Sequence, residues 1–435
     1  MTEATEAKEI NYNSPEYKRS RTAYMAQCTF EYFVSLLVAD AFLAKVLTEL
    51  GMSDFLVGII SSFISLSFVF QLLSIFVVRA KISTKKLVIL ADTVSQLFFM
   101  LIYIIPFLPA SANAKKVFVI VAILVAYACK YLILSLCFKW ANSYVDPHHR
   151  AVYSANKEII SLVTGIIFTT VMGAVIDKFE NIGNIRGGFL FIAVSMLILN
   201  ICNFISLMMI KKEEKREHSA DSVPLRIVMK HTLYSKDFRN VIIMTCMWDF
   251  AKYFSIGFMG VYKTKDLMMS VFAIQMINMI ANGCRVLVSR GFGRFSDKYS
   301  YAKGMELALC IAALGFFFNM FSTPLHWYFI VIYTVLYNCA TAGLNQNSFN
   351  IAYSYVPIEY VPQAMAFKNS IGGICGFGAA LLGGKLLDFI QASGNNFLGI
   401  NLYGQQLLSG VSFVLTAVTI LFIHFVIAKQ KVKLQ

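Results

Sequence analysis

The chain has 435 residues, of which 58% are hydrophobic and 14% are charged, and its mean hydropathy is +0.65. Soluble domains carry about 25% charged residues, so this composition excludes an ordinary soluble protein and indicates one that lives in a lipid bilayer. The net charge of +14 could suggest a nucleic-acid-binding protein, but the basic residues flank apolar segments, so we expect no nucleic-acid partner.

Apolar runs of about 20 residues are long enough to cross a bilayer as helices. The chain contains twelve such runs, at residues 24–46, 54–78, 86–106, 116–140, 157–177, 186–210, 240–262, 269–290, 303–322, 326–353, 364–389 and 403–428. We therefore expect an all-α membrane protein built as two six-helix bundles. Its predicted parts are an N-terminal tail (1–23), a first bundle (24–210), a linker (211–239), a second bundle (240–428) and a C-terminal tail (429–435).

The basic residues predict the orientation in the membrane. Lys and Arg are concentrated in the two tails, the linker and the loops on the same side, and they are sparse in the loops on the other side. By the positive-inside rule, both termini face the cytoplasm of a multi-pass protein in the cell membrane. Residues 1–23 lack the apolar stretch of a cleavable signal. All nine cysteines fall inside predicted spans without a C-x-x-C spacing, so we expect no disulfide and no metal site.

The chain carries an internal repeat, because residues 143–184 align without a gap on residues 354–395. The matching pairs include Ala155 with Ala366, Lys157 with Lys368, Gly165 with Gly376, Gly173 with Gly384, and Asp177 with Asp388. A weaker match pairs Phe30-Glu31-Tyr32 with Trp248-Asp249-Phe250. Two like halves in a membrane protein are typical of secondary transporters, whose binding site lies between the halves.

Between the eighth and ninth predicted spans the chain reads Gly293-Arg294-Phe295-Ser296-Asp297-Lys298-Tyr299. This segment resembles the G-x-x-x-D-[RK]-x-G-[RK]-[RK] loop motif of the major facilitator superfamily, and the resemblance extends over almost the whole chain. It implies two bundles that rock about a central cavity, with Gly293, Arg294, Asp297 and Lys298 as gating residues. Gly293 would allow two helices to approach closely, and Asp297 would contact a helix N-terminus or a basic partner in the other half.

Three positions depart from the family pattern. The later glycine of the motif is replaced by Ser300 or Tyr301, and Val78 stands at the acid's place in the first half. The fifth span also lacks the Gly-Pro pair of the family's drug–proton antiporters, because Gly165 is followed by Ile166. The last departure argues against multidrug export.

Charged residues within the spans are expected to face a cavity or a partner, because facing lipid is costly. Lys130 lies near the middle of the fourth span, so we interpret it as a substrate-binding or coupling residue; the alternative is a buried salt bridge to Glu31 or Asp92. Glu31 has no basic residue three or four positions away. A carboxylate in such a place suits reversible protonation and hence proton coupling.

The repeat counterpart of Glu31 is Asp249, which lies three residues before Lys252. This spacing places both side chains on one face of a helix, where they could pair, so their role is either structural or a part of coupling.

A polar stripe follows the eighth span, where Gln275, Asn278, Asn282 and Arg285 share one helix face. We expect it to line the translocation path, although Arg285 could instead extend to the membrane surface. The tenth span carries a similar line of Asn338, Thr341 and Asn345, for which hydrogen bonds between helices are the alternative.

No enzyme signature is found, since the chain lacks a P-loop and a complete dinucleotide-binding loop. We expect no enzyme, no cofactor and no bound metal. The prediction is a monomeric secondary transporter that moves a small polar solute, which could be anionic, by alternating access. The expected driving force is symport with a proton or another cation, and the alternative is the gradient of the solute itself. The alternatives are an exporter of amphipathic compounds and a membrane sensor or scaffold with a transporter fold.

Overall fold

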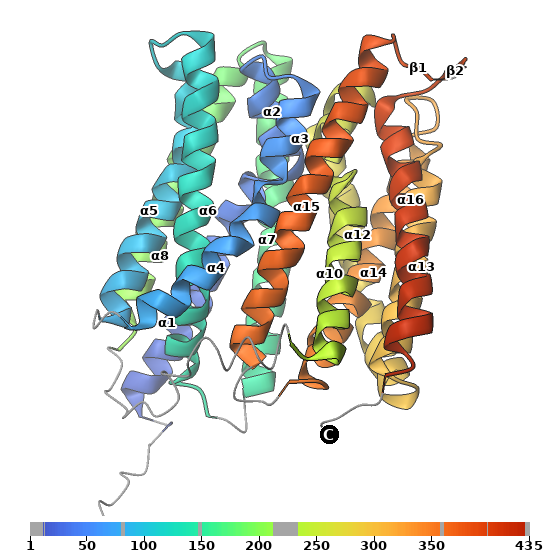
Figure 1. Cartoon of the computed structure of the whole chain (residues 1–435). Coiled ribbons are helices and arrows are strands. Elements are labelled where there is room, and N and C mark those ends of the chain that lie inside the picture. Colours follow the sequence, from blue (N-terminus) through green and yellow to red (C-terminus); the bar gives the residue numbers. More distant parts are fainter. Residues whose placement is uncertain are drawn as a thin grey trace, which may run out of the picture.

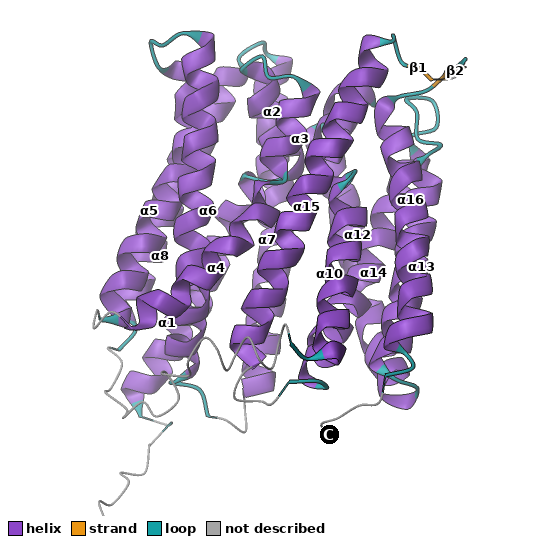
Figure 2. Ribbon diagram, viewed as in Figure 1, coloured by secondary structure: helices purple, strands orange, loops and turns teal. Residues whose placement is uncertain are grey.

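The computed structural model describes residues 12, 14–79, 83–146, 150–211, 234–356, 361–397 and 399–430. Nearly all of these residues are helical (Figure 2), because backbone groups in lipid must find their hydrogen bonds within the segment. The helices stand side by side (Figure 1). We call the end of the bundle where α1 begins and η6 ends the termini end, and the opposite end the distal end.

In the first half, the described residues form nine helical elements. They are α1 (Pro15–Leu37), α2 (Asp40–Glu49), α3 (Asp54–Ser61), α4 (Phe63–Arg79), α5 (Thr84–Ile104), the 3-10 turn η1 (Ile105–Phe107), α6 (Ala112–Asn142), α7 (Arg150–Asn181) and α8 (Ile185–Met209).

The second half repeats this plan. Its elements are α10 (Lys236–Tyr253), η3 (Ile256–Phe258), α11 (Met259–Val261), η4 (Tyr262–Asp266), α12 (Val271–Lys298), α13 (Tyr301–Asn319), α14 (Tyr328–Tyr353), α15 (Val361–Ala392), α16 (Gly404–Phe422) and η6 (Ile423–Ile427). A two-residue ladder of β1 (Asn396–Phe397) and β2 (Ile400–Asn401) lies at the distal end (Figure 1).

The helix that contains the first predicted span begins earlier than this span and is interrupted within it. Helix α1 begins at Pro15, inside the predicted tail, because the Ser14 hydroxyl accepts a hydrogen bond from the Tyr17 amide and caps the helix. It ends at Leu37, and α2 starts at Asp40, whose φ of 46° lies in the left-handed region and interrupts the helix.

The predicted spans 54–78 and 240–262 are also broken helices. The breaks fall where two backbones meet: a Cβ on Gly257 would lie 2.6 Å from the carbonyl oxygen of Gly58, and a Cβ on Gly58 would lie 2.0 Å from the ring of Phe258. Only glycine permits this approach between α3 and η3. The sequence pattern shows the glycines but does not show which backbones they face.

Ten helical stretches in the described part of the chain are long and apolar enough to cross a membrane. The predicted first and tenth spans are absent from this group, because α1 carries charged residues and α14 carries several asparagines. Residues on the outside of the bundle are apolar and exposed, such as Leu287 and Leu90, as expected for surfaces in contact with lipid.

Each half has its own hydrophobic core. In the first half the core includes Leu37, Tyr103 and Phe189, and in the second it includes Phe238 and Phe316. All five side chains are fully buried. The first core continues into the second half through Val261, Val271 and Ala380, so the two halves are also packed against each other.

Candidate functional site

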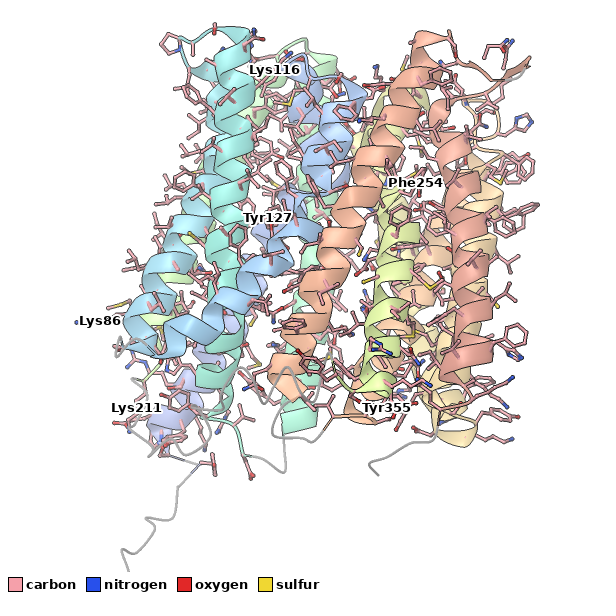
Figure 3. All side chains as sticks on the ribbon, viewed as in Figure 1. Lys86, Lys116, Tyr127, Lys211, Phe254 and Tyr355 are labelled. Carbon is pink, nitrogen blue, oxygen red and sulfur yellow. The ribbon has the colours of Figure 1, made fainter. Side chains whose placement is uncertain are left out.

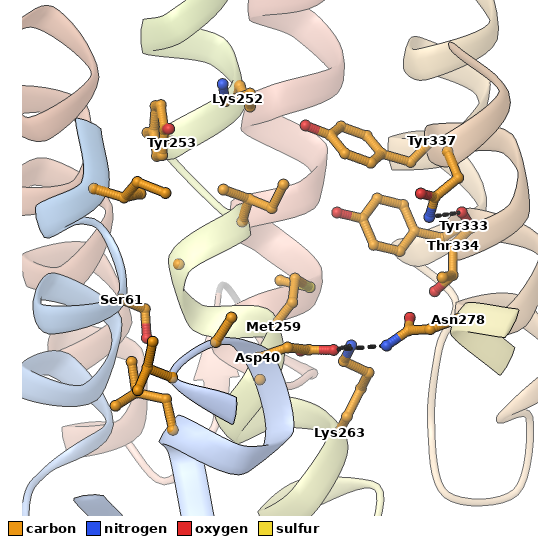
Figure 4. A pocket seen from close by; sticks show the side chains of 18 of the residues that line it. Asp40, Ser61, Lys252, Tyr253, Met259, Lys263, Asn278, Tyr333, Thr334 and Tyr337 are labelled. Carbon is orange, nitrogen blue, oxygen red and sulfur yellow. Dashed lines mark hydrogen bonds and ion pairs between the residues drawn. The ribbon is translucent and has the colours of Figure 1, made fainter. Parts of the chain in front are cut away.

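A cavity of about 410 Å³ lies between the two halves, which is within the range of small-ligand sites. The α1–α2 connection and residues of α2, α3, α4 and α6 line it from the first half, and residues of α10 to η4, α12 and α14 line it from the second. Four tyrosines contribute to the wall, namely Tyr127, Tyr253, Tyr333 and Tyr337. Tyr127 lies on α6 (Figure 3), and the rings of Tyr333 and Tyr337 extend from α14 into the cavity (Figure 4).

Three of the residues singled out in the sequence line this cavity: Lys252, Asn278 and Asn338. Lys252 Nζ lies 3.3 Å from Oδ1 of Asp249 and 4.2 Å from the ring centroid of Tyr253. The predicted pairing on one face of α10 is therefore formed, and the ammonium group faces both its acid and the cavity.

The first half contains an ion pair whose acid, Glu31, is the repeat counterpart of Asp249. Lys130 Nζ of α6 lies 2.9 Å from Oε1 of Glu31 of α1, and their side chains are 20% and 22% exposed. The Gln27 amide also donates to Glu31 Oε2, at 3.0 Å. Lys130 is thus paired with Glu31, one of the two partners considered for it, and not with Asp92.

Each of these acids has a second lysine nearby. Lys157 of α7 interacts electrostatically with Glu31, and Lys368 of α15 interacts electrostatically with Asp249. Lys368 is only 2% exposed, and it donates to Ser348 Oγ at 2.8 Å. The two lysines are a matched pair in the internal repeat. Each half therefore holds one acid with two lysines, an arrangement we call the acid–lysine triad.

Lys157 and Lys368 were not singled out as site residues from the sequence. The repeat alignment contained the signal, because it paired them. What the sequence could not show is that the first and fifth spans of each half bring a lysine close to the acid. In the second half, α15 packs directly against Asp249, because a Cβ on Gly372, one turn after Lys368, would lie 2.5 Å from Asp249 Oδ2.

The residues of the polar stripe on α12 differ in burial and in contacts. Gln275 is buried, Asn278 donates to Asp40 Oδ2 at 3.2 Å, and Asn282 and Arg285 are half-buried. Arg285 interacts electrostatically with Tyr32 of α1 in the other half, which places its charge near the boundary between the halves.

The polar line on α14 bonds mostly to its own helix. Asn338 donates to the Thr334 carbonyl at 2.9 Å, and Thr341 donates to the Asn338 carbonyl at 2.7 Å. Asn345 is exposed. Between helices, Gln346 donates to Ser289 Oγ of α12 at 3.2 Å.

Polar contacts between the halves gather at the distal end. Asp40 Oδ2 lies 2.6 Å from Lys263 Nζ (Figure 4), and Asp54 Oδ1 lies 2.8 Å from Lys265 Nζ. Gln391 of α15 also donates to Asp54 Oδ2, at 2.6 Å. The sequence did not predict these pairs, because each joins residues far apart in the chain.

Asp177, the repeat counterpart of Asp388, lies near the end of α7 and also joins the two halves at the distal end. Its carboxylate accepts the backbone amides of Val271 and Phe272, at 2.9 and 2.8 Å. These amides begin α12, so an acid of one half caps the positive end of a helix in the other half. Its repeat counterpart Asp388 is exposed and caps no helix in the described part of the chain.

The predicted gating motif occupies the last turns of α12 and is not a loop between helices. Arg294, Asp297 and Lys298 are exposed, and Asp297 makes no hydrogen bond or ion pair with the residues the structure describes. Gly293 does not create a close helix contact, since the nearest atom to an added Cβ is 3.9 Å away. Gly304 does so instead, because its Cβ would lie 2.1 Å from Ser296 Oγ.

The sequence matches the Major Facilitator Superfamily over residues 24–380. The chain belongs to this superfamily. A comparison with curated protein sequences finds no significant match. Superfamily membership and the apolar helices make the chain a multi-pass membrane protein with a transporter fold, and the twelve-span architecture expected from the sequence is confirmed.

Several solved transporter structures share the fold. The nucleoside transporter NupG has a TM-score of 0.68 at 15% identity, covering 96% of this chain and 100% of that one. The peptide transporter PepTSo2 has a TM-score of 0.67 at 13% identity, covering 95% and 98%. The D-xylose–proton symporter has a TM-score of 0.67 at 11% identity, covering 93% and 96%. At these identities the likeness concerns the superfamily fold alone.

Proposed function

We propose that the chain is a secondary transporter that moves a small organic anion by alternating access. The observation that carries this proposal is the pair of acid–lysine triads, because each triad holds one negative and two positive groups. Arg285 adds a further cation near the boundary between the halves. A buried excess of positive charge calls for an anion, since unpaired charge is costly in a low dielectric.

The cavity supports a ligand that is polar as well as charged. Lys252 presents its ammonium group to the cavity, and four tyrosine hydroxyls can donate hydrogen bonds there. A carboxylate or phosphate group could accept several of these bonds at once. The volume of about 410 Å³ fits a small molecule.

The Glu31–Lys130 pair offers a route to proton coupling. A proton that binds to the Glu31 carboxylate removes its negative charge and releases Lys130, which can then pair with the anion. Asp249 and Lys252 would act in the same way in the second half. This exchange favours symport, because the anion binds best when the acids are protonated.

The closed distal end favours one orientation of the cycle. The contacts of Asp40, Asp54 and Asp177 hold the halves together there, and we propose that they separate when the cavity opens to the distal side. The exposed Asp297 would then form the predicted contact at the termini end. Lys86 and Lys211 lie at the termini end (Figure 3), where the basic residues support a cytoplasmic location for both termini. We propose a monomer as the working unit, since each chain has a complete cavity.

The test uses the purified chain in detergent and then in proteoliposomes. Mono- and dicarboxylates, phosphate esters, neutral sugars, nucleosides, zwitterionic amino acids and amphipathic cations are compared for their effect on the unfolding temperature. We expect anions to raise this temperature and to be taken up when the outside is acidic. Stabilisation by sugars, nucleosides or amphipathic cations alone would contradict an anion site. Binding without flux would instead indicate a sensor.

A further inference from the structure

Asp92 of α5 is a buried carboxylate that the proposed path does not use. Its residue is 3% exposed, and it does not line the central cavity. The Asn203 amide of α8 donates to Asp92 Oδ2, and Gln96 also hydrogen-bonds to the carboxylate. Within the described part of the chain, no lysine, arginine or histidine forms an ion pair with it, so the carboxyl group is buried without an ion-pair partner.

The residues around Asp92 form a polar cluster between α5 and α8. The two helices run in opposite directions. Gln96 therefore lies one turn from Asp92 towards the distal end, and Asn200 lies one turn from Asn203 in the same direction. The four residues are 1% to 4% exposed, so the cluster has two polar layers inside an apolar half.

The cluster has more oxygen acceptors than donors. Gln96 Oε1, Asn200 Oδ1 and Asn203 Oδ1 are all buried, and none of them receives a hydrogen bond from the residues that the structure describes. Buried acceptors without a partner are destabilising, and so is a buried carboxylate without a cation. Rotation of a side-chain amide by half a turn exchanges its oxygen and nitrogen, so these amides can turn their oxygens towards Asp92.

We propose that Asp92, Gln96, Asn200 and Asn203 bind one monovalent cation between α5 and α8. One positive charge balances the one carboxylate, and up to three amide oxygens can complete the coordination. Oxygen ligands of this kind suit hard metal ions. The number of free oxygens favours Na⁺ over a proton, which would satisfy a single acceptor.

The position of the cluster couples it to the acid–lysine triad of the first half. Asp92 interacts electrostatically with Glu31 of α1 and Lys130 of α6, and also with the thiols of Cys28 and Cys137. A cation beside Asp92 attracts Glu31 and repels Lys130, so it favours release of Lys130 towards an anion. This coupling step rests on the proposed anion transport, whereas cation binding itself does not.

The experiment measures cation binding without any organic substrate. Binding of radiolabelled Na⁺ and the unfolding temperature are measured on the purified full chain, with choline replacing Na⁺ at constant ionic strength, and again across a pH series without Na⁺. We expect Na⁺ to bind once per chain and to raise the unfolding temperature. Asp92→Asn keeps the shape of the side chain and should abolish binding. Asn200→Ala should weaken it by about tenfold, the effect of losing one charge-assisted contact.

Asp388→Asn makes the same chemical change at an exposed carboxylate and should leave Na⁺ binding unchanged. If the wild type instead responds to pH and Asp92→Asn removes that response, the cation is a proton. The proposal is overturned if the wild type responds to neither ion, or if Asp92→Asn binds Na⁺ as the wild type does. If Asp92→Asn fails to fold, the Asn200→Ala result decides: unchanged Na⁺ affinity in that variant counts against the site.

Discussion

Lys130 of α6 and Glu31 of α1 are joined by a 2.9 Å ion pair that leaves both side chains about one fifth exposed. This intermediate burial matters, because a fully buried pair would be a fixed structural element and a surface pair would contribute little. A partly exposed pair can exchange its partner. The following predictions test this pair and the other contacts described above.

Glu31→Gln should destabilise the protein and abolish uptake. It leaves Lys130 without its acid, at a cost between that of a surface pair and a buried one, about 1–3 kcal/mol. The double variant Glu31→Gln with Lys130→Met should recover the unfolding temperature, because no charge is left alone, but it should not recover uptake. Full uptake in the double variant would show that the pair serves stability only.

Lys368→Met should raise the unfolding temperature while it lowers uptake of an anion. Among the residues the structure describes, the buried wild-type ammonium group hydrogen-bonds only to the Ser348 hydroxyl, and methionine fills similar space without the cost of burying a charge. Thermal unfolding in detergent and flux in proteoliposomes measure the two effects. The exposed Lys429→Met serves as the control. A lower unfolding temperature for Lys368→Met would mean that Asp249 pairs with this lysine strongly enough to hold the fold.

Asp177→Ala should favour opening of the distal end. The carboxylate caps α12 across the halves, and loss of a cap costs about 0.5–2 kcal/mol, which corresponds to about a 2- to 30-fold shift in the opening equilibrium. The readout is labelling of a cysteine introduced at Ser61, in the cavity wall, by a thiol reagent added from the distal side of oriented proteoliposomes. Asp388→Ala should not change the labelling rate. Equal rates in all three proteins would exclude a gating role for the cap.

Gly373→Ala and Gly378→Ala should have opposite effects although both lie on α15. A Cβ on Gly373 would lie 2.1 Å from the Ser65 carbonyl oxygen of α4, whereas nothing lies within 4 Å of a Cβ on Gly378. The first substitution forces the halves apart and should reduce stability and flux. The second adds helix propensity, worth about 0.5–1 kcal/mol. Similar unfolding temperatures for both variants would contradict the packing between α4 and α15.

The architecture could be predicted from the sequence. The length of the apolar runs indicates the spans, the asymmetry of the basic residues indicates the orientation, and the internal repeat indicates the two halves. The breaks at Asp40 and around Gly257 could not be predicted. They depend on which backbone meets which glycine, and that is decided by the packing of one half on the other. A hydropathy threshold finds only ten candidate spans among the described residues, because it misses the two more polar helices α1 and α14.

The candidate site was predictable only within single helices. The Asp249–Lys252 pair follows from helical spacing, and Lys252, Asn278 and Asn338 do line the cavity. The sequence limited the possible partners of Lys130 to two acids, but it could not show which of them forms the ion pair. The contacts of Lys263 and Asp177 join distant parts of the chain, so no local pattern pointed to them. The proposed roles of the other site residues stay predictions.

The distal contacts place acids on one half and bases on the other. Asp40, Asp54 and Asp177 belong to the first half, whereas Lys263 and Lys265 belong to the second. When the distal end opens, these groups lose their partners. The rim formed by the first half is then negative, and the rim formed by the second half is positive. An anion that enters from the distal side would then be attracted to the positive rim before it reaches the central cavity, so the second half would contact the substrate first.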